Sequence, residues 1–227
     1  RKMPTSIYAT AYIRGEGIVD NAKVHVGAEN ILKLDIRHFF DNITYPIVKE
    51  KVFKPNIFSE PIRILLSILC VYEHSIPQGA PTSPDISNII MRDFDKEIGD
   101  WCKERNINYT RYCDDMTFSG TFNPGQIISV VRKELFRLGL QLNENKTRVR
   151  RKGQRQEVTG IVVNEKLQLP KNVRKKIRQE LYYIRKYGLE SHMEYCDISK
   201  EKYLQHLIGK IQYGLFINPY DYELQDY

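Results

Sequence analysis

Two parts of the chain carry the pattern of buried strands that end in acidic residues. The run at 31–34 is almost entirely apolar, and Asp35 follows it directly. Residues 109–118 are rich in aromatic, threonine and methionine side chains, interrupted by a turn that holds Asp114 and Asp115. Such residues on both sides of a short polar turn are typical of a β-hairpin. The pattern therefore predicts a strand that ends at Asp35 and a hairpin whose tip carries the other two carboxylates.

Three other stretches space their apolar residues three and four positions apart, as an amphipathic helix does. Ser83 is the predicted N-cap of the first helix, with Pro84 at its first helical position. The apolar stripes are Ile86, Ile89, Ile90, Phe94 and Trp101 in the first helix, Val173, Ile177, Leu181 and Ile184 in the second, and Leu204, Leu207, Ile208, Ile211 and Leu215 in the third.

The acidic residues are candidate metal ligands. Adjacent carboxylates such as Asp114 and Asp115 repel each other unless a cation holds them, and carboxylate oxygens suit magnesium. An ordinary turn rich in aspartate explains this pair taken alone. Asp35 makes a site more plausible, because two strand ends can converge on one place. Phosphoryl transfer by two metal ions uses carboxylates from different segments to hold cations about 3.5 to 4 Å apart.

The segment 76–88 lies between these acidic positions and forms a second candidate site. It packs three prolines and the pair Gln78-Gly79 ahead of the first predicted helix. A substrate could rest against this rigid turn. The alternative is a capped core helix with no further role, which explains the apolar stripe but not Gln78-Gly79.

Composition bounds the kind of protein. The chain has 227 residues with 41% apolar content, enough to bury a substantial core, and it shows no secretory or membrane-spanning segment. The longest apolar stretch, at 64–72, is too short to span a bilayer. Its four cysteines lack close spacing, which predicts reduced thiols in a cytoplasmic protein without a membrane partner.

Positive charge is concentrated late in the chain. Residues 146–187 hold fourteen Lys or Arg and three Glu, a net charge of +11, whereas the whole chain carries +7. A patch of this kind is typical of a protein that binds a polyanion, although a solvated helix face is the ordinary alternative. The candidate nucleic-acid contacts are Arg148, Arg150, Arg151, Lys152, Arg155, Arg174, Lys175 and Arg178.

The order of these features resembles the reverse transcriptase family. The segment 35–40 is similar to its first catalytic motif, Gln78-Gly79 to its second, and Tyr112-Cys113-Asp114-Asp115 to its tyrosine-x-Asp-Asp box. The block Pro77-Gln-Gly-Ala-Pro-Thr-Ser-Pro-Asp-Ile-Ser-Asn88 and the stretch Val158-Thr-Gly-Ile-Val-Val-Asn164 resemble bacterial retron enzymes in particular. The resemblance covers about residues 10 to 220.

The resemblance implies roles for single residues. Asp35 and Asp114 would be the essential ligands of two Mg²⁺ ions, for which Mn²⁺ is a possible substitute, and Asp115 a supporting catalytic carboxylate. The backbone carbonyl of Ile36 would complete the nucleotide-side metal. The remaining nucleotide-binding candidates are Phe40, which would reject a ribose 2'-hydroxyl, Gln78 and Gly79, which would support the nucleotide, and Lys146, which would neutralise phosphate or donate a proton.

Two of these roles have ordinary alternatives. Phe39 and Phe40 are adjacent, so at most one is expected to face the nucleotide, and the motif register favours Phe40. A core phenylalanine is the alternative. Lys146 is equally well explained as an exposed lysine that begins a basic strand.

The implied architecture is an α+β right-hand polymerase. Residues 30–169 would form a palm, an antiparallel sheet with packed helices that carries the catalytic motifs, and 170–227 a helical thumb. Residues 1–29 would be the remainder of the fingers and their connection to the palm. The family's finger strands should precede residue 1, so the N-terminal fingers are expected to be incomplete here.

The implied function is retron-type reverse transcription, RNA-templated DNA synthesis from deoxynucleoside triphosphates. The template and primer would come from one structured non-coding RNA, with synthesis starting at a 2'-hydroxyl and the RNA–DNA product staying bound. An effector (toxin) protein and a role in anti-phage defence are implied as well. The alternatives are a group II intron-like enzyme, a template-independent defence polymerase and a non-catalytic RNA-binding scaffold.

Overall fold

The computed structural model describes residues 5–196 and 200–226, so the predicted finger remainder is described from residue 5 onward. It has an α+β fold built on a four-stranded antiparallel sheet in the order β2-β3-β1-β4. The strands are β1 (Asn30–Asp35), β2 (Asn108–Tyr112), β3 (Asp115–Gly120) and β4 (Arg148–Arg151), and a separate short hairpin pairs β5 (Glu157–Val158) with β6 (Ile161–Val162). The predicted strand at 31–34 and the predicted hairpin at 109–118 are both present.

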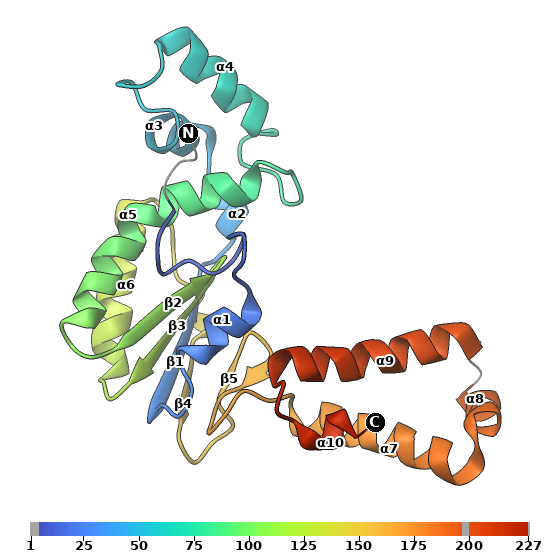
Figure 1. Cartoon of the computed structure of the whole chain (residues 1–227). Helices are drawn as coiled ribbons and strands as arrows, with labels where there is room; N and C mark the ends of the chain where they lie inside the picture. The colour runs from blue at the N-terminus through green and yellow to red at the C-terminus, as the bar shows by residue number, and fades with distance from the viewer. Residues whose placement is uncertain (1–4, 197–199, 227) are drawn as a thin grey trace.

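Helices pack on one face of the sheet. Figure 1 shows α5 (Ser83–Lys103) and α6 (Pro124–Arg137) running alongside the strands. Side chains alternate between the two faces of a strand, so Leu32 and Leu34 of β1 lie on the same face. Both are buried in a large apolar cluster with residues of the two helices. Members of that cluster include Met116, Phe118, Ile86, Ile90, Phe94, Ile127 and Val131.

The opposite face of the sheet is covered only in part. Ile31 of β1 is buried there in a second cluster with Val158 of β5 and Ile177 of α7 (Lys171–Tyr187). Beyond Ile31 the same face continues through Lys33 to Asp35, which is where the acidic residues gather.

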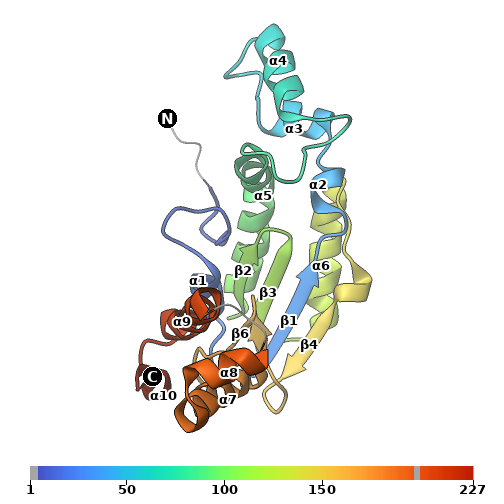
Figure 2. The same ribbon diagram turned by 90° about the vertical axis from the view of Figure 1, so that its right-hand side faces the viewer.

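The remaining helices comprise short helices near the sheet and two extensions. The short ones are α1 (Ile18–Lys23), α2 (Phe39–Asn42) and the 3-10 turn η1 (Glu144–Lys146). Figure 2 shows α3 (Tyr45–Lys51) and α4 (Glu60–Cys70) projecting from one end of the molecule, and α7 at the other end with α8 (Leu189–Cys196), α9 (Lys200–Ile217) and α10 (Tyr222–Gln225). Both thumb-like helices predicted from apolar spacing are present as α7 and α9. None of the described helices combines the length and the apolar character needed to cross a membrane.

One predicted helix start is wrong by one residue. The helix α5 begins at Ser83 with Thr82 as its N-cap, which puts Pro84 at the second helical position. The Ser83 hydroxyl donates a hydrogen bond of 2.7 Å to the carbonyl of Pro77 and is therefore committed to the preceding turn. The stripe itself is correct in its centre, because Ile86, Ile90 and Phe94 are buried.

A buried histidine just after α1 connects this helix to the sheet face that carries Lys33 and Asp35. His25 is fully buried, and its Nδ1 and Nε2 each lie 2.7 Å from a hydroxyl oxygen, of Ser119 and of Thr110 respectively. Burial lowers the pKa of the imidazole to about 3. The ring is therefore neutral in the folded protein across the ordinary pH range.

We predict that His25 makes the protein acid-sensitive. In the unfolded chain a histidine has a pKa of about 6.5, so the unfolded state gains a proton that the folded state refuses as the pH falls from about 6.5 toward 3. Stability is retained above this window and lost at roughly 1.4 kcal/mol per pH unit within it. Between pH 7 and 4.5, urea unfolding should show wild type losing roughly 2–3 kcal/mol more than His25→Gln. Parallel losses in the two proteins would contradict the prediction.

Candidate active site

The pairing of β1 with β3 brings the acidic residues together. Asp35 and Asp115 are directly opposite each other in the antiparallel register, so their side chains share a face. Asp114 lies in the turn before β3, where its carbonyl accepts a hydrogen bond of 3.2 Å from the backbone N–H of Ile36. All four residues line one cavity of about 840 Å³. The fold thus gathers the three predicted carboxylates and Ile36 in one place.

Asp35 is held by the segment that follows α6. Its side chain is buried, with Oδ1 accepting from Asn143 Nδ2 at 3.0 Å and Oδ2 accepting from Lys146 Nζ at 2.8 Å. The backbone N–H of Asn143 also donates to the Asp35 carbonyl, at 2.8 Å. The contact with Asp35 raises the pKa of the Lys146 amine above its ordinary value. Lys146 is thus an exposed lysine whose ammonium pairs with Asp35, one of the candidate catalytic residues.

The carboxylates sit in an unfavourable electrostatic setting. Burial raises the pKa of the Asp115 carboxyl above its ordinary value. Lys33 opposes that rise, whereas the negative charges of Asp114 and Asp35 add to it. Gathering like charges in a half-enclosed site costs free energy that a bound cation would recover.

The donor set fits a divalent metal ion. Within residues 5–196 and 200–226, no three His, Cys, Asp or Glu side chains are arranged as a ready-made metal centre. However, Asp35, Asp114 and Asp115 supply hard oxygen donors to one cavity. We conclude that these residues are suited to hold divalent ions.

The predicted nucleotide-binding residues are divided by the fold. Phe40, which is half-buried, and Gln78 both line the main cavity, whereas Gly79 does not. Gly79 has a φ of +93°, a backbone conformation that only glycine adopts readily. Phe39 is a buried core residue, although it reaches the cavity too, and its ring centroid lies 5.4 Å from that of Phe40.

The predicted basic contacts lie in three places. Arg148, Arg150 and Arg155 line a second cavity of about 440 Å³ together with Lys33. Lys33 is opposite Arg148 in the β1–β4 register, so this basic cavity is on the same face as Asp35. By the same alternation, Arg151 of β4 points to the other face, and Lys152 follows the strand.

The third group belongs to α7. Arg174 pairs with Asp221 and, at 2.8 Å, with Glu223, while Arg178 pairs with Glu223 at 2.6 Å. Lys175 is exposed. Two of the three predicted helix contacts therefore have carboxylate partners next to or within α10.

Several residues of the site carry no local sequence signal. Tyr12 lines the main cavity, and its hydroxyl lies 3.4 Å from the Cys113 sulfur. Asn143 reaches Asp35 from a segment 108 residues away, whereas Lys33 lies two residues before Asp35 on the same strand. Neither position stands out as a site residue from its neighbours in sequence, so only the three-dimensional fold reveals their part in the site.

The comparison with protein families decides the class. The model for reverse transcriptase (RNA-dependent DNA polymerase) matches residues 3–200. The chain belongs to the reverse transcriptase family. Retron Ec83 reverse transcriptase of Escherichia coli is 32% identical over 93% of this chain and 70% of its own length. Retron Mx65 reverse transcriptase of Myxococcus xanthus is 29% identical over 96% of this chain and 53% of its own length.

These relatives assign the chain to the retron branch of the family, and the chain spans only part of the length of each. Telomerase from Candida tropicalis has a similar fold, with a TM-score of 0.54 and 12% sequence identity over 72% of this chain and 41% of the telomerase chain. A likeness at that identity concerns the fold only. It agrees with the α+β palm-like architecture expected for a reverse transcriptase.

Proposed function

We propose that the protein is a retron-type RNA-directed DNA polymerase. A primer hydroxyl attacks the α-phosphorus of a deoxynucleoside triphosphate, a new P–O bond forms, and the bond to the β-phosphate oxygen breaks with release of pyrophosphate. The observation that supports this most is the β1–β3 register, which sets Asp35 opposite Asp115 beside Asp114 in one cavity of a reverse transcriptase family member.

Asp35 and Asp114 are the proposed ligands of two magnesium ions, with Asp115 in support and the Ile36 carbonyl on the nucleotide side. When bound, such ions align the attacking and leaving oxygens and offset the charge that develops between them. The chain's own contribution is to fix the carboxylates. The side chain of Asn143 donates to the Asp35 carboxylate, and its backbone N–H donates to the Asp35 carbonyl. The Ile36 N–H donates to the carbonyl of Asp114.

The nucleotide would bind in the main cavity beside these carboxylates. Phe40 would lie beneath the incoming sugar, where a 2'-hydroxyl would clash with the ring. Gln78 would contact the nucleotide from the other side, and Gly79 would shape the turn that presents it. The contact with Asp35 raises the pKa of Lys146 further above neutral pH, so Lys146 is better suited to neutralise a phosphate than to act as an acid.

The division into palm and thumb follows the same proposal. Residues 30–169 are the palm and 170–227 the thumb, with 1–29 leading from the fingers. The basic cavity of Lys33, Arg148, Arg150 and Arg155 lies on the carboxylate face of the palm, where the backbone of a bound hybrid would pass. Lys175 adds an exposed cation from the thumb side.

The proposed partners come from membership of the retron branch. The template and primer would be one structured non-coding RNA, with the first nucleotide joined to a guanosine 2'-hydroxyl and the RNA–DNA product retained. An effector protein would act with the complex in anti-phage defence, in the cytoplasm of a bacterium.

The test is DNA synthesis by the full-length protein purified with its co-expressed RNA, given magnesium and labelled deoxynucleotides. Template-matched DNA joined to RNA through a 2' linkage is expected from wild type, and its loss from the Asp114→Ala, Asp115→Ala double variant. DNA unrelated to the RNA would mean template-independent synthesis. No DNA from a folded, RNA-loaded wild type would favour an RNA-binding scaffold.

A second prediction separates the basic residues by the face they occupy. Arg148→Ala with Arg150→Ala should weaken binding of an RNA–DNA hybrid about tenfold near 0.15 M salt and reduce the slope of log K against log salt by roughly 2. The matched control is Arg151→Ala with Lys152→Ala, which removes the same charge outside the basic cavity. It should change affinity less than about threefold. Equal losses in the two pairs, measured by fluorescence anisotropy, would contradict the assignment.

A further inference from the structure

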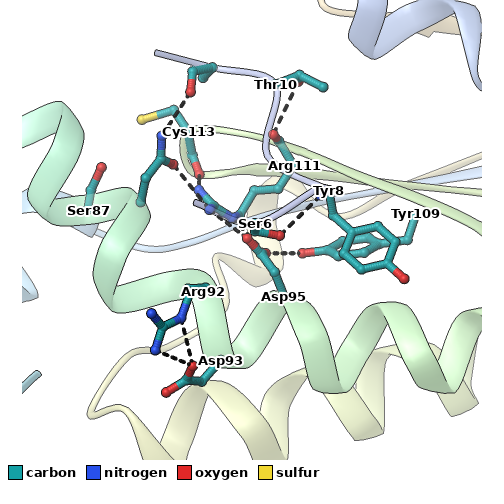
Figure 3. A network of polar contacts seen from close by, with 12 residues as sticks. Ser6, Tyr8, Thr10, Ser87, Arg92, Asp93, Asp95, Tyr109, Arg111 and Cys113 are labelled. Atoms are coloured by element: carbon teal, nitrogen blue, oxygen red, sulfur yellow. Dashed lines mark hydrogen bonds and ion pairs between the residues drawn. The ribbon is translucent and has the colours of Figure 1, made fainter. Parts of the chain in front are cut away.

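A fully buried arginine lies directly behind the catalytic turn. Arg111 of β2 and Asp95 of α5 both have side chains with 0% exposure. The guanidinium donates from Nε to Asp95 Oδ1 at 2.8 Å and from Nη2 to Asp95 Oδ2 at 2.7 Å. This two-pronged contact, drawn in Figure 3, fixes both the position and the plane of the guanidinium.

The other terminal nitrogen of the Arg111 guanidinium reaches the turn. Arg111 Nη1 donates to the carbonyl of Cys113 at 2.9 Å. Cys113 directly precedes Asp114 and has a φ of +60°, a conformation that non-glycine residues rarely adopt. The carbonyl of the next residue, Asp114, is held from the opposite strand by the Ile36 N–H. The two consecutive carbonyls of the turn are therefore anchored to different parts of the palm.

Further contacts lock the arginine in place. Asn88 of α5 accepts from Arg111 Nη2 at 3.2 Å and donates to the Ala11 carbonyl at 2.9 Å. The Tyr109 hydroxyl donates to Asp95 at 2.8 Å. The network thus connects α5, β2 and the segment before α1 to a single carbonyl at the active site.

Stability alone does not account for this arrangement. A buried ion pair gains little over well-packed apolar side chains, because both charges lose their hydration. What apolar side chains cannot supply is a donor directed at the Cys113 carbonyl. A lysine could pair with Asp95 but lacks the rigid fork that serves Asp95 and the turn together.

We infer that Arg111 is a positioning residue, held by Asp95 and Asn88, that sets the turn so that Asp114 and Asp115 meet Asp35. The inference rests on the proposed function for its kinetic effect and on the geometry alone for its effect on cation binding. Small displacements of catalytic groups cost large factors in rate, whereas substrate affinity depends on contacts elsewhere in the cavity.

The test is Arg111→Lys, which keeps the buried charge but removes the fork. With the full-length protein bound to an RNA–DNA hybrid, Mn²⁺ binding measured by electron paramagnetic resonance should weaken several-fold. The kcat for nucleotide addition should fall about 10- to 100-fold, while KM for the nucleotide stays within about threefold of wild type. Wild-type values of kcat and Mn²⁺ affinity in the folded variant would overturn the inference.

A matched control comes from a second buried arginine. Arg63 of α4 has a side chain only 7% exposed and pairs with Glu50 and Glu60, away from the cavity. Arg63→Lys should lose stability without changing Mn²⁺ affinity or kcat. Equal effects of the two substitutions on Mn²⁺ affinity would reduce Arg111 to a structural residue and overturn the inference.

Two outcomes keep the test independent of the proposed function and of folding. If wild type makes no DNA but binds Mn²⁺ more tightly than Arg111→Lys, the proposed function fails and the positioning role stands. If Arg111→Lys does not fold, Asp95→Asn combined with Arg111→Met removes both buried charges and leaves an acceptor for Tyr109. The same losses are expected from that variant, and wild-type Mn²⁺ affinity would overturn the inference.

Discussion

The antiparallel register between β1 and β3 is the constraint on which the site depends. A shift by one residue would turn every β1 side chain to the other face of the sheet. Leu32 and Leu34 would then leave the core beneath α5 and α6, while Asp35 would enter it. Each of these leucines contributes roughly 1.5–3 kcal/mol by burial, so the apolar face fixes the register. The position of Asp35 opposite Asp115 is therefore a consequence of core packing.

The same geometry brings like charges close together, and the surrounding residues offset their repulsion. Three carboxylates share one cavity, and burial already raises the pKa of Asp115. Lys146 and Asn143 contact Asp35, and Lys33 acts on Asp115 from two residues before Asp35 on the same strand face. These cationic and amide groups stabilise the charged carboxylates when no ion is bound. The carboxylate oxygens remain suited to divalent ions.

The elements with strong local patterns were predictable from the sequence. The strand ending at Asp35, the hairpin carrying Asp114 and the stripes of α5, α7 and α9 follow from apolar periodicity, and the family was recognisable from the order of three motifs. The start of α5 was misplaced, because nothing in the sequence tells that the Ser83 hydroxyl bonds the Pro77 carbonyl. Helices α3 and α4 were not predicted at all.

The contacts that complete the site were beyond sequence reasoning. Lys146 was a candidate nucleotide contact, but its contact with Asp35, like that of Asn143, joins residues more than a hundred positions apart. Arg111 acts through a backbone carbonyl that has no side-chain signature. Charge counting also treated Arg174 and Arg178 like Lys175, although the fold gives the two arginines carboxylate partners. Only tertiary structure distinguishes a paired cation from a free one.

The most direct measurement of the central claim is the location of Mn²⁺ by anomalous scattering in crystals of the full-length protein with an RNA–DNA hybrid and a non-hydrolysable deoxynucleotide. The account predicts two ions in the main cavity, with Asp35 and Asp114 in contact with both. Ions bound elsewhere, or a bound nucleotide whose phosphates lie away from these carboxylates, would contradict it.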